Sequence, residues 1–148
     1  MDIQEISSNK KQFLNLLLLA DEQESMIERY LERGRMFILY DSNQTISVCV
    51  ITDEGNGVLE IKNIAVDPEY QRRGYGKRFI SFLFEYFRHK YKEMIVGTGD
   101  SPQTTNFYTS CGFRYSHRIP NFFIENYDHP IFENGKQLID MIYFKKDF

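Results

Sequence analysis

Two glycines one residue apart lie inside a basic stretch, and this combination is suited to binding an anion. The stretch is QRRGYGKR, Gln71 to Arg78, between an apolar run and a helical pattern. Glycine lets a backbone approach a ligand closely, and the first turn of a helix has N–H groups without intrahelical partners. Arginine and lysine side chains add positive potential. The stretch therefore predicts a site for a phosphorylated ligand.

Two common phosphate-binding patterns do not fit this stretch. The P-loop pattern needs an earlier glycine at a fixed spacing and a Lys-Ser or Lys-Thr pair, whereas Gly76 is followed by Lys77 and Arg78. The dinucleotide pattern G-x-G-x-x-G requires a third glycine, and Phe79 stands there. An ordinary connecting turn without a ligand is the remaining structural alternative.

Two segments together resemble the GNAT superfamily of N-acetyltransferases. LEIKNIAVDPEYQRRGYGKRFISFL, residues 59–83, resembles the core motif of that family, in which Gln/Arg-x-x-Gly-x-Gly/Ala lies between the fourth strand and a long helix. TNFYTSCGFRY, residues 105–115, resembles a later family motif, and the order of expected elements matches as well. The resemblance covers most of the chain and implies one N-acetyltransferase domain over residues 1–148.

The resemblance implies acetyl-CoA as co-substrate, held mainly by backbone groups. The pyrophosphate would rest on the amides of Arg72 through Lys77, and the pantetheine arm would run along the preceding strand near Ile64 to Val66. Asn106 matches a position that often binds the cofactor arm, although a hydrogen bond to local backbone explains it almost as well. The expected cofactor-binding residues are Ile64, Ala65, Val66, Gln71, Arg72, Arg73, Gly74, Tyr75, Gly76, Lys77 and Asn106.

The same resemblance implies direct attack of a primary amine on the thioester in a ternary complex, which needs a proton acceptor and a proton donor. Tyr108 occupies the position of the frequent general acid, and Glu60 the position of a glutamate base. Tyr108 is alternatively a core-edge residue, and Glu60 equally suits an ion pair with Lys62 on the same strand face. Cys111 as nucleophile and His117 as base are less favoured, since neither has an evident supporting pattern.

Periodicity and turn residues predict an α+β fold: a mostly antiparallel, twisted sheet of six to seven strands with about four helices. The expected strands are residues 3–6, 35–41, 45–52, 58–66, 93–98, 113–119 and 137–146. The expected helices are residues 10–20, 22–33, 74–91 and 102–110, and a long aromatic loop precedes the last strand.

Composition narrows the function classes. A net charge of −3 gives no basic field for nucleic acid, and two cysteines with three scattered histidines show no metal-ligand spacing. No apolar run approaches the roughly 20 residues that span a bilayer. We therefore expect no nucleic acid, no metal and no membrane association, and a cytoplasmic location.

The acceptor is much less defined than the donor. In this fold the first helices and the late loops would form its site, and here they supply Glu22, Glu24, Glu28 and the segment NFFIENYDHPIFEN, residues 121–134. Acidic and aromatic walls suit a cationic small-molecule amine, while a peptide amine stays open. The late segment equally suits a homodimer contact. The alternative function is a non-catalytic acyl-CoA-binding sensor, against which Tyr108 argues.

Overall fold

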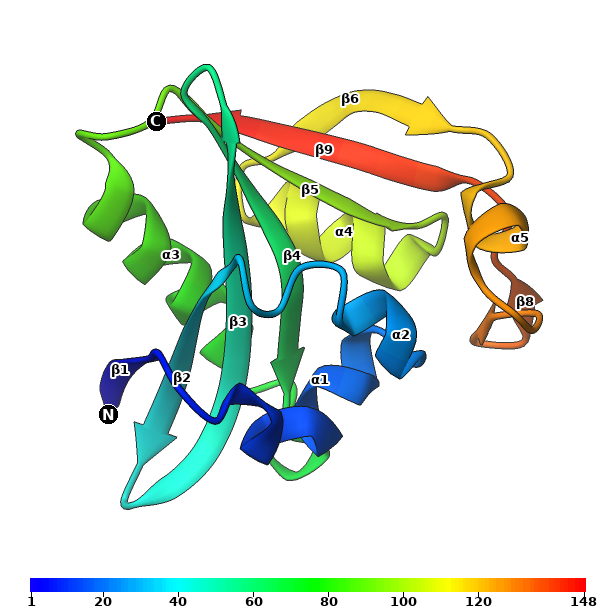
Figure 1. Ribbon diagram of the computed structural model, residues 1–148. Helices are drawn as coiled ribbons and strands as arrows, with labels where there is room; N and C mark the ends of the chain where they lie inside the picture. The colour runs from blue at the N-terminus through cyan, green and yellow to red at the C-terminus, as the bar shows by residue number, and fades with distance from the viewer.

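A seven-stranded sheet forms the centre of the computed structural model, which describes residues 1–148 (Figure 1). The strand order is β1-β2-β3-β4-β5-β9-β6. Every neighbouring pair is antiparallel except β4 and β5, which are parallel. The predicted α+β class and mostly antiparallel sheet are therefore confirmed.

The elements have the following bounds. The main-sheet strands are β1 Asp2–Ile6, β2 Arg35–Asp41, β3 Gln44–Gly55, β4 Val58–Val66, β5 Glu93–Gly99, β6 Arg114–Ile119 and β9 Met141–Asp147. The α-helices are α1 Leu14–Ala20, α2 Glu24–Ile27, α3 Tyr75–Phe87, α4 Pro102–Ser110 and α5 Phe122–Asn126. Lys10–Phe13 and Pro68–Tyr70 are 3-10 helices, and β7 Phe132–Glu133 pairs with β8 Lys136–Gln137 in a separate two-stranded sheet.

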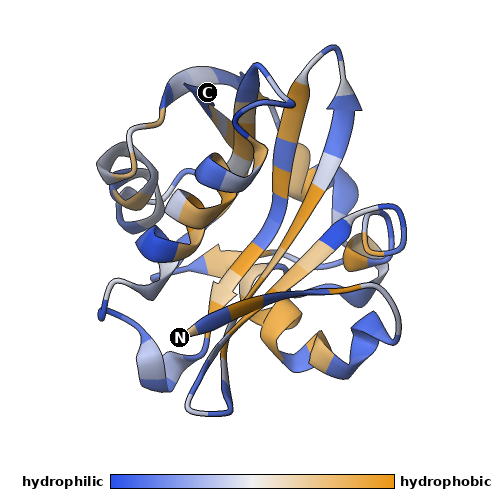
Figure 2. Ribbon diagram, turned by 90° about the vertical axis from the view of Figure 1, so that its left-hand side faces the viewer, coloured by the Kyte–Doolittle hydropathy of each residue, from blue (hydrophilic) through white to orange (hydrophobic).

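Helices cover both faces of the sheet, which explains the nearly unbroken apolar runs of β2 and β3. Met36 and Ile38 of β2 pack with Leu17 and Ile27 of α1 and α2 on one face. The alternate residue Phe37 packs with residues of α3 on the other face. In Figure 2 the central strands are accordingly coloured as hydrophobic along much of their length. The two cores hold β3 and β4 rigidly between helical layers.

A β-bulge in β4 changes which side chains face which layer. Val50 pairs with Asn63 and Ile51 with Ile61, so Lys62 is an extra residue in the ladder. Ile61 packs on the α3 side, and a regular strand would place Ala65 on the same side. Ala65 instead packs with α1 and α2. The bulge therefore re-aims the second half of β4, as bulges beside functional sites commonly do.

The parallel strands β4 and β5 separate halfway along their length. Their pairing runs from Val58 with Glu93 to Ile61 with Val96 and then stops. Figure 1 shows β4 and β5 side by side at their beginnings and then diverging. The edge of β4 from Lys62 to Val66 that faces β5 therefore has no neighbouring strand, and an opening forms in the middle of the sheet.

The second helix, the third helix and the last strand depart most from their predicted bounds. The second helix was expected over residues 22–33, but α2 covers only Glu24–Ile27. The buried Lys10 ammonium donates to the carbonyl oxygens of Leu31 and Gly34 at 2.8 and 2.7 Å. These bonds stabilise a turn where the helix was expected to continue. The helix expected to reach residue 91 ends at Phe87.

The late segment is not simply a loop before a long strand. It contains α5 and the β7–β8 hairpin, and the last strand begins at Met141 rather than at residue 137. Asn134 and Gly135 both have positive φ, 52° and 78°, which is the geometry of a tight hairpin turn. The Asn-Gly dipeptide is a sequence signal for a hairpin. The flanking strands have only two residues each, which is too short to give a strand pattern in the sequence.

Candidate active site

The glycine stretch forms the turn that begins α3, as predicted. Gly74 has a φ of 84° and caps the helix, and Arg72 also has a positive φ of 64°. Arg78 N–H donates to the Gly74 carbonyl, so the N–H groups of residues 75–77 precede the first intrahelical hydrogen bond. These free amides and the helix dipole favour an anion at this end of α3.

Contacts between this turn and the rest of the fold fix its position at the end of β4. The Gln71 side-chain amide donates to the Val66 carbonyl at 3.0 Å, and Tyr75 donates to Asp41 at 2.9 Å. A Cβ on Gly76 would lie 3.1 Å from Cζ of Phe107, so a side chain there would press against α4. Arg72, Arg73 and Lys77 are exposed around the turn. Their positive charges are therefore available to a ligand.

The predicted pantetheine-binding residues lie on the open edge of β4. Ile64, Ala65 and Val66 pair with Cys49, Val48 and Ser47 of β3 on one side and have no strand partner on the side of β5. Ser47 Oγ donates to the Ala65 carbonyl at 2.6 Å, which ties this half of β4 to β3. The turn and the strand edge thus form one continuous path into the opening between β4 and β5.

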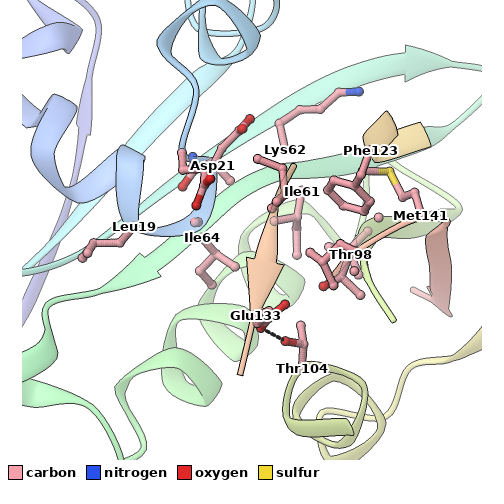
Figure 3. Close-up of a pocket in the computed structure, with 18 of the residues that line it drawn as sticks. Leu19, Asp21, Ile61, Lys62, Ile64, Thr98, Thr104, Phe123, Glu133 and Met141 are labelled. Carbon is pink, nitrogen blue, oxygen red and sulfur yellow. Dashed lines mark hydrogen bonds between the residues drawn. The ribbon is translucent and has the colours of Figure 1, made fainter. Parts of the chain in front are cut away.

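A pocket of about 350 Å³ lies in this opening (Figure 3). Its walls come from the end of α1, the separated halves of β4 and β5, α4 and the late segment. The lining residues are Leu19, Ala20, Asp21, Glu22, Ile61, Lys62, Asn63, Ile64, Val96, Gly97, Thr98, Gly99, Thr104, Tyr108, Phe123, Tyr127, Ile131, Phe132, Glu133, Leu138 and Met141. Twelve of these residues are hydrophobic, and the polar ones include three carboxylates and one lysine.

Tyr108 lines this pocket from α4 and is 5% exposed. Its ring packs against Phe107, Phe113 and Phe144, with centroids 5.1, 5.7 and 6.3 Å away. No residue of the protein forms a hydrogen bond with its hydroxyl, whereas the buried hydroxyl of Tyr143 does have a partner. Burial, and secondarily nearby thiol and carboxyl groups, raises the pKa of the Tyr108 phenol above its usual range. The phenol is therefore protonated and free to donate.

Asn106 lies two residues before Tyr108 on α4 and is exposed. It does not line the pocket around Tyr108. Asn106 lies on the helix that packs against the glycine turn through Phe107. Its contact with the cofactor arm stays a prediction.

Glu60 is buried at 6% exposure but does not line the pocket. Lys62 Nζ lies 3.0 Å from its Oε2, and the Tyr143 hydroxyl donates to the same oxygen at 3.1 Å. Gly97 permits this second contact, since a Cβ there would lie 2.9 Å from Cζ of Tyr143. The predicted alternative, an ion pair with Lys62, is thus present in the structure.

The two less favoured residues, Cys111 and His117, lie away from the pocket lining. Burial raises the pKa of the Cys111 thiol, which keeps it protonated and a poor nucleophile. His117 is exposed on β6 and stacks on Tyr143 with ring centroids 4.7 Å apart.

The acidic wall predicted for the acceptor is present in part. Glu22 lines the pocket, whereas Glu24 and Glu28 bind Lys11 at 3.0 and 2.7 Å on the helix surface. Asp21 and Glu133 also line the pocket, and sequence reasoning did not select them. Glu133 belonged to the acidic and aromatic late segment, but only the folded chain shows which acid of that segment faces inward.

A hydrogen-bond network joins the end of α1 to β4 and to the late segment. Asp21 accepts from the Tyr127 hydroxyl at 2.7 Å and from the Tyr30 hydroxyl at 3.0 Å, and the Asn63 amide donates to Tyr30 at 3.1 Å. Burial raises the pKa of Asp21, and the two tyrosine hydrogen bonds oppose this. The bulge at Lys62 makes this network, because it turns Asn63 toward α1. Asn63 Oδ1 is buried without a hydrogen-bond donor.

The fold contains neither a metal-binding cluster nor a membrane-spanning helix. No group of three or more His, Cys, Asp or Glu side chains is arranged to hold a metal ion. None of the helices has the length and apolar character required to cross a bilayer.

The sequence of this chain is similar to those of known acetyltransferases. A family model described as an acetyltransferase (GNAT) domain matches residues 32–115. A Bacillus subtilis protein described as an uncharacterized N-acetyltransferase, YvbK, is 35% identical over 130 residues, which is 86% of this chain and 84% of the relative.

Two crystal structures extend the similarity to nearly the whole chain. A GNAT family acetyltransferase from Elizabethkingia anophelis with acetyl-CoA bound has a TM-score of 0.93 and 32% identity, covering 99% of this chain and 97% of that one. A Bacillus subtilis acetyltransferase in complex with CoA has a TM-score of 0.90 and 32% identity, with the same coverage. With the matched family model, these similarities show that the chain belongs to the GNAT acetyltransferase family.

Proposed function

We propose that the protein transfers the acetyl group of acetyl-CoA to a primary amine by direct attack within a ternary complex. The observation that carries this proposal is one continuous surface. The free amides at the start of α3 lead along the open edge of β4 to the free hydroxyl of Tyr108. Residues 1–148 would act as one catalytic domain.

Acetyl-CoA fits the chemistry of this surface. A pyrophosphate needs donors and positive charge, which the N–H groups of residues 75–77 and the side chains of Arg72, Arg73 and Lys77 supply. A pantetheine arm carries two amides, and the unpaired edge of β4 at Ile64–Val66 offers backbone groups to them. Two relatives were crystallised with acetyl-CoA or CoA, which supports the same choice.

A primary amine fits the far side of the pocket. Three carboxylates, Asp21, Glu22 and Glu133, line it against one lysine, Lys62, whose charge is paired with Glu60. A carboxylate-rich wall favours an ammonium group. Apolar side chains on both sides, among them Leu19 and Phe132, favour an acceptor with an apolar body.

Acetyl transfer requires two proton movements, and the residues of the pocket offer groups for both. An ammonium must first lose a proton, after which its nitrogen can form the C–N bond. The C–S bond then breaks with its electron pair on sulfur, and Tyr108 donates a proton to that sulfur. The second proton of the nitrogen returns to Tyr108 through solvent, so the products are an amide, the CoA thiol and one proton.

Thermal unfolding with added ligands tests the donor part of the proposal. A ligand that binds only the folded state at 100 times its Kd adds about 2.7 kcal/mol, which raises the Tm of a chain of this size by about 8 °C. We expect this rise with acetyl-CoA and CoA, and none with NAD or ATP. Absence of a rise with the CoA compounds would contradict the proposal.

Thiol release distinguishes an enzyme from an acyl-CoA-binding sensor. We expect amine-dependent release of CoA thiol when the protein, acetyl-CoA and a panel of primary amines are combined. Binding of acetyl-CoA without release for any amine would favour the sensor. The panel should contain 2-phenylethylamine, octylamine, spermidine and kanamycin, which differ in apolar surface and in number of charges.

A further inference from the structure

The carboxylates near the pocket differ in the kind and number of their partners, and this difference bears on which one can accept a proton from the acceptor. Asp21 accepts hydrogen bonds from two tyrosine hydroxyls. Glu22 lies at the pocket wall with His129 Nε2 2.9 Å from its Oε1. Both therefore hold the late segment against the end of α1.

Glu60 is also occupied. Its Oε2 contacts both Lys62 and the Tyr143 hydroxyl, and the residue is outside the pocket lining. The pair with Lys62 nevertheless matters for the pocket. It neutralises the only lysine or arginine among the lining residues, so that the wall does not repel a cationic acceptor.

Glu133 is the carboxylate of this group that has neither a basic partner nor more than one hydrogen bond. It lies on β7, where the Asn134–Gly135 turn of the hairpin holds it over α4, and it lines the pocket. Its Oε1 accepts from the Thr104 hydroxyl at 2.8 Å, and no lysine, arginine or histidine lies within ion-pair distance. Figure 3 shows the Glu133 side chain directed toward Thr104 on α4.

The anchor of Glu133 also places it near Tyr108. Thr104 and Tyr108 are four residues apart on α4, so they lie on one helix face with Cβ atoms about 5–6 Å apart, and both line the pocket. The charge of Glu133 is one of the causes that raise the pKa of the Tyr108 phenol, which reflects the same proximity. A proton acceptor and a proton donor thus face one space.

We propose that Glu133 is a catalytic residue that receives the ammonium group of the acceptor and takes its first proton. This inference rests on the proposed acetyl transfer and assigns the base of that reaction. The proton moves from the ammonium nitrogen to a carboxylate oxygen of Glu133, which leaves the nitrogen lone pair free to attack the thioester carbon. Tyr108, which lies one helical turn from Thr104, then donates a proton to the sulfur. The two proton movements therefore occur on neighbouring groups.

Kinetics of matched variants test this assignment. Glu133→Gln keeps the size of the side chain and an oxygen for Thr104, and we expect its kcat/KM to fall about 10²-fold, at the lower end of general-base effects. Glu125→Gln on α5 is the control, since Glu125 is exposed and outside the pocket lining. Glu60→Gln is measured in parallel. Thermal unfolding with acetyl-CoA verifies that each variant folds and binds the donor.

The pH profile distinguishes a base from a structural residue. The other charged or titratable groups lining the pocket are Asp21, Glu22, Lys62, Tyr108 and Tyr127. We expect Glu133→Gln to abolish the acidic limb of kcat/KM, and Glu60→Gln to retain it. Benzhydrazide, whose terminal nitrogen is already neutral at pH 7, should lose much less activity with Glu133→Gln than 2-phenylethylamine does.

The assignment would be overturned, while the proposed function stands, by an unchanged acidic limb in Glu133→Gln or by its loss in Glu60→Gln alone. Equal losses for benzhydrazide and 2-phenylethylamine would also overturn it, because a base is not needed for an amine that is already neutral. A wild-type protein that binds acetyl-CoA but acetylates no acceptor would overturn the proposed function itself, and Glu133 as its base with it.

Discussion

Replacing Tyr108 by phenylalanine separates the packing of this side chain from its chemistry. The ring contacts with Phe107, Phe113 and Phe144 do not involve the hydroxyl, which has no hydrogen-bond partner in the protein. Removal of this unbonded hydroxyl leaves no donor or acceptor of the protein unsatisfied, so the free energy of unfolding should change by less than about 1 kcal/mol. The affinity for acetyl-CoA should also stay the same, because the proposed contacts of acetyl-CoA are mainly to backbone.

Turnover, in contrast, should fall. General acids contribute about 10²–10⁴-fold, and a thiolate with a pKa near 8.5 leaves more readily than most groups, so the lower end applies. A loss of about 10²-fold corresponds to about 2.7 kcal/mol of transition-state stabilisation. Because burial raises the pKa of Tyr108, the wild-type phenol keeps its proton throughout the neutral range, and no loss of activity from its ionisation should appear below pH 10.

The assay is the rate of thiol release at saturating acetyl-CoA, with Tyr91→Phe as control. Tyr91 donates to Asp53 at 3.1 Å and does not line the pocket, so its loss should not affect turnover. The reasoning is refuted if Tyr108→Phe retains turnover within about twofold of wild type. It is equally refuted if turnover falls only in proportion to a loss of folded protein, as measured by thermal unfolding.

Three other perturbations have outcomes that the structure determines. Gly76→Val should weaken acetyl-CoA binding at least about tenfold in a titration. Gly76 lies at the start of α3, and even a Cβ on it would lie 3.1 Å from Phe107 of α4. Unchanged affinity would argue against a ligand on this turn. Lys10→Met should lower the free energy of unfolding by about 3 kcal/mol, because the buried carbonyls of Leu31 and Gly34 lose a charged donor. Lys11→Met, at the exposed neighbouring position, should lower it by less than about 1 kcal/mol. Equal losses for the two variants in denaturant titrations would contradict this. The ring N–H groups of His129 donate to the carboxylates of Asp128 and Glu22, and these hydrogen bonds raise the pKa of His129 above 6.5. The contribution of His129 to stability is therefore complete below pH 6.5 and disappears as the pH rises through the raised value. The difference in Tm between wild type and His129→Gln should shrink with rising pH, and a constant or growing difference would refute this.

The turn that begins α3 could be predicted because it is local in sequence. The glycines, the basic residues and the start of α3 are consecutive, and the torsion angles that glycine permits are a property of the residue itself. The strand of residues 58–66 and the helix of residues 102–110 were likewise predicted with the bounds that the structure has. Each follows from periodicity and a nearby glycine or proline.

The arrangement of the pocket walls could not be predicted because it depends on contacts between distant segments. The bulge at Lys62 is invisible in a strand pattern, yet it decides that Asn63 faces α1. Glu133 is one of several acids in the late segment, and only the short β7–β8 hairpin brings it to Thr104, 29 positions earlier. The ion pair of Glu60 with Lys62 could be predicted from their places on one strand, whereas the hydrogen bond from Tyr143, 83 positions later, is visible only in the folded sheet.

The most direct test of the central claim is the stoichiometry of acetyl transfer by the wild-type protein. Acetyl-CoA and each amine of the panel are incubated with the protein, and CoA thiol and acetylated amine are quantified in the same sample. The proposed function predicts one amide for each thiol released, with at least one amine and only when the protein is present. Thiol release without amide, or acetyl-CoA binding without either product, would contradict the claim that this pocket catalyses acetyl transfer to an amine.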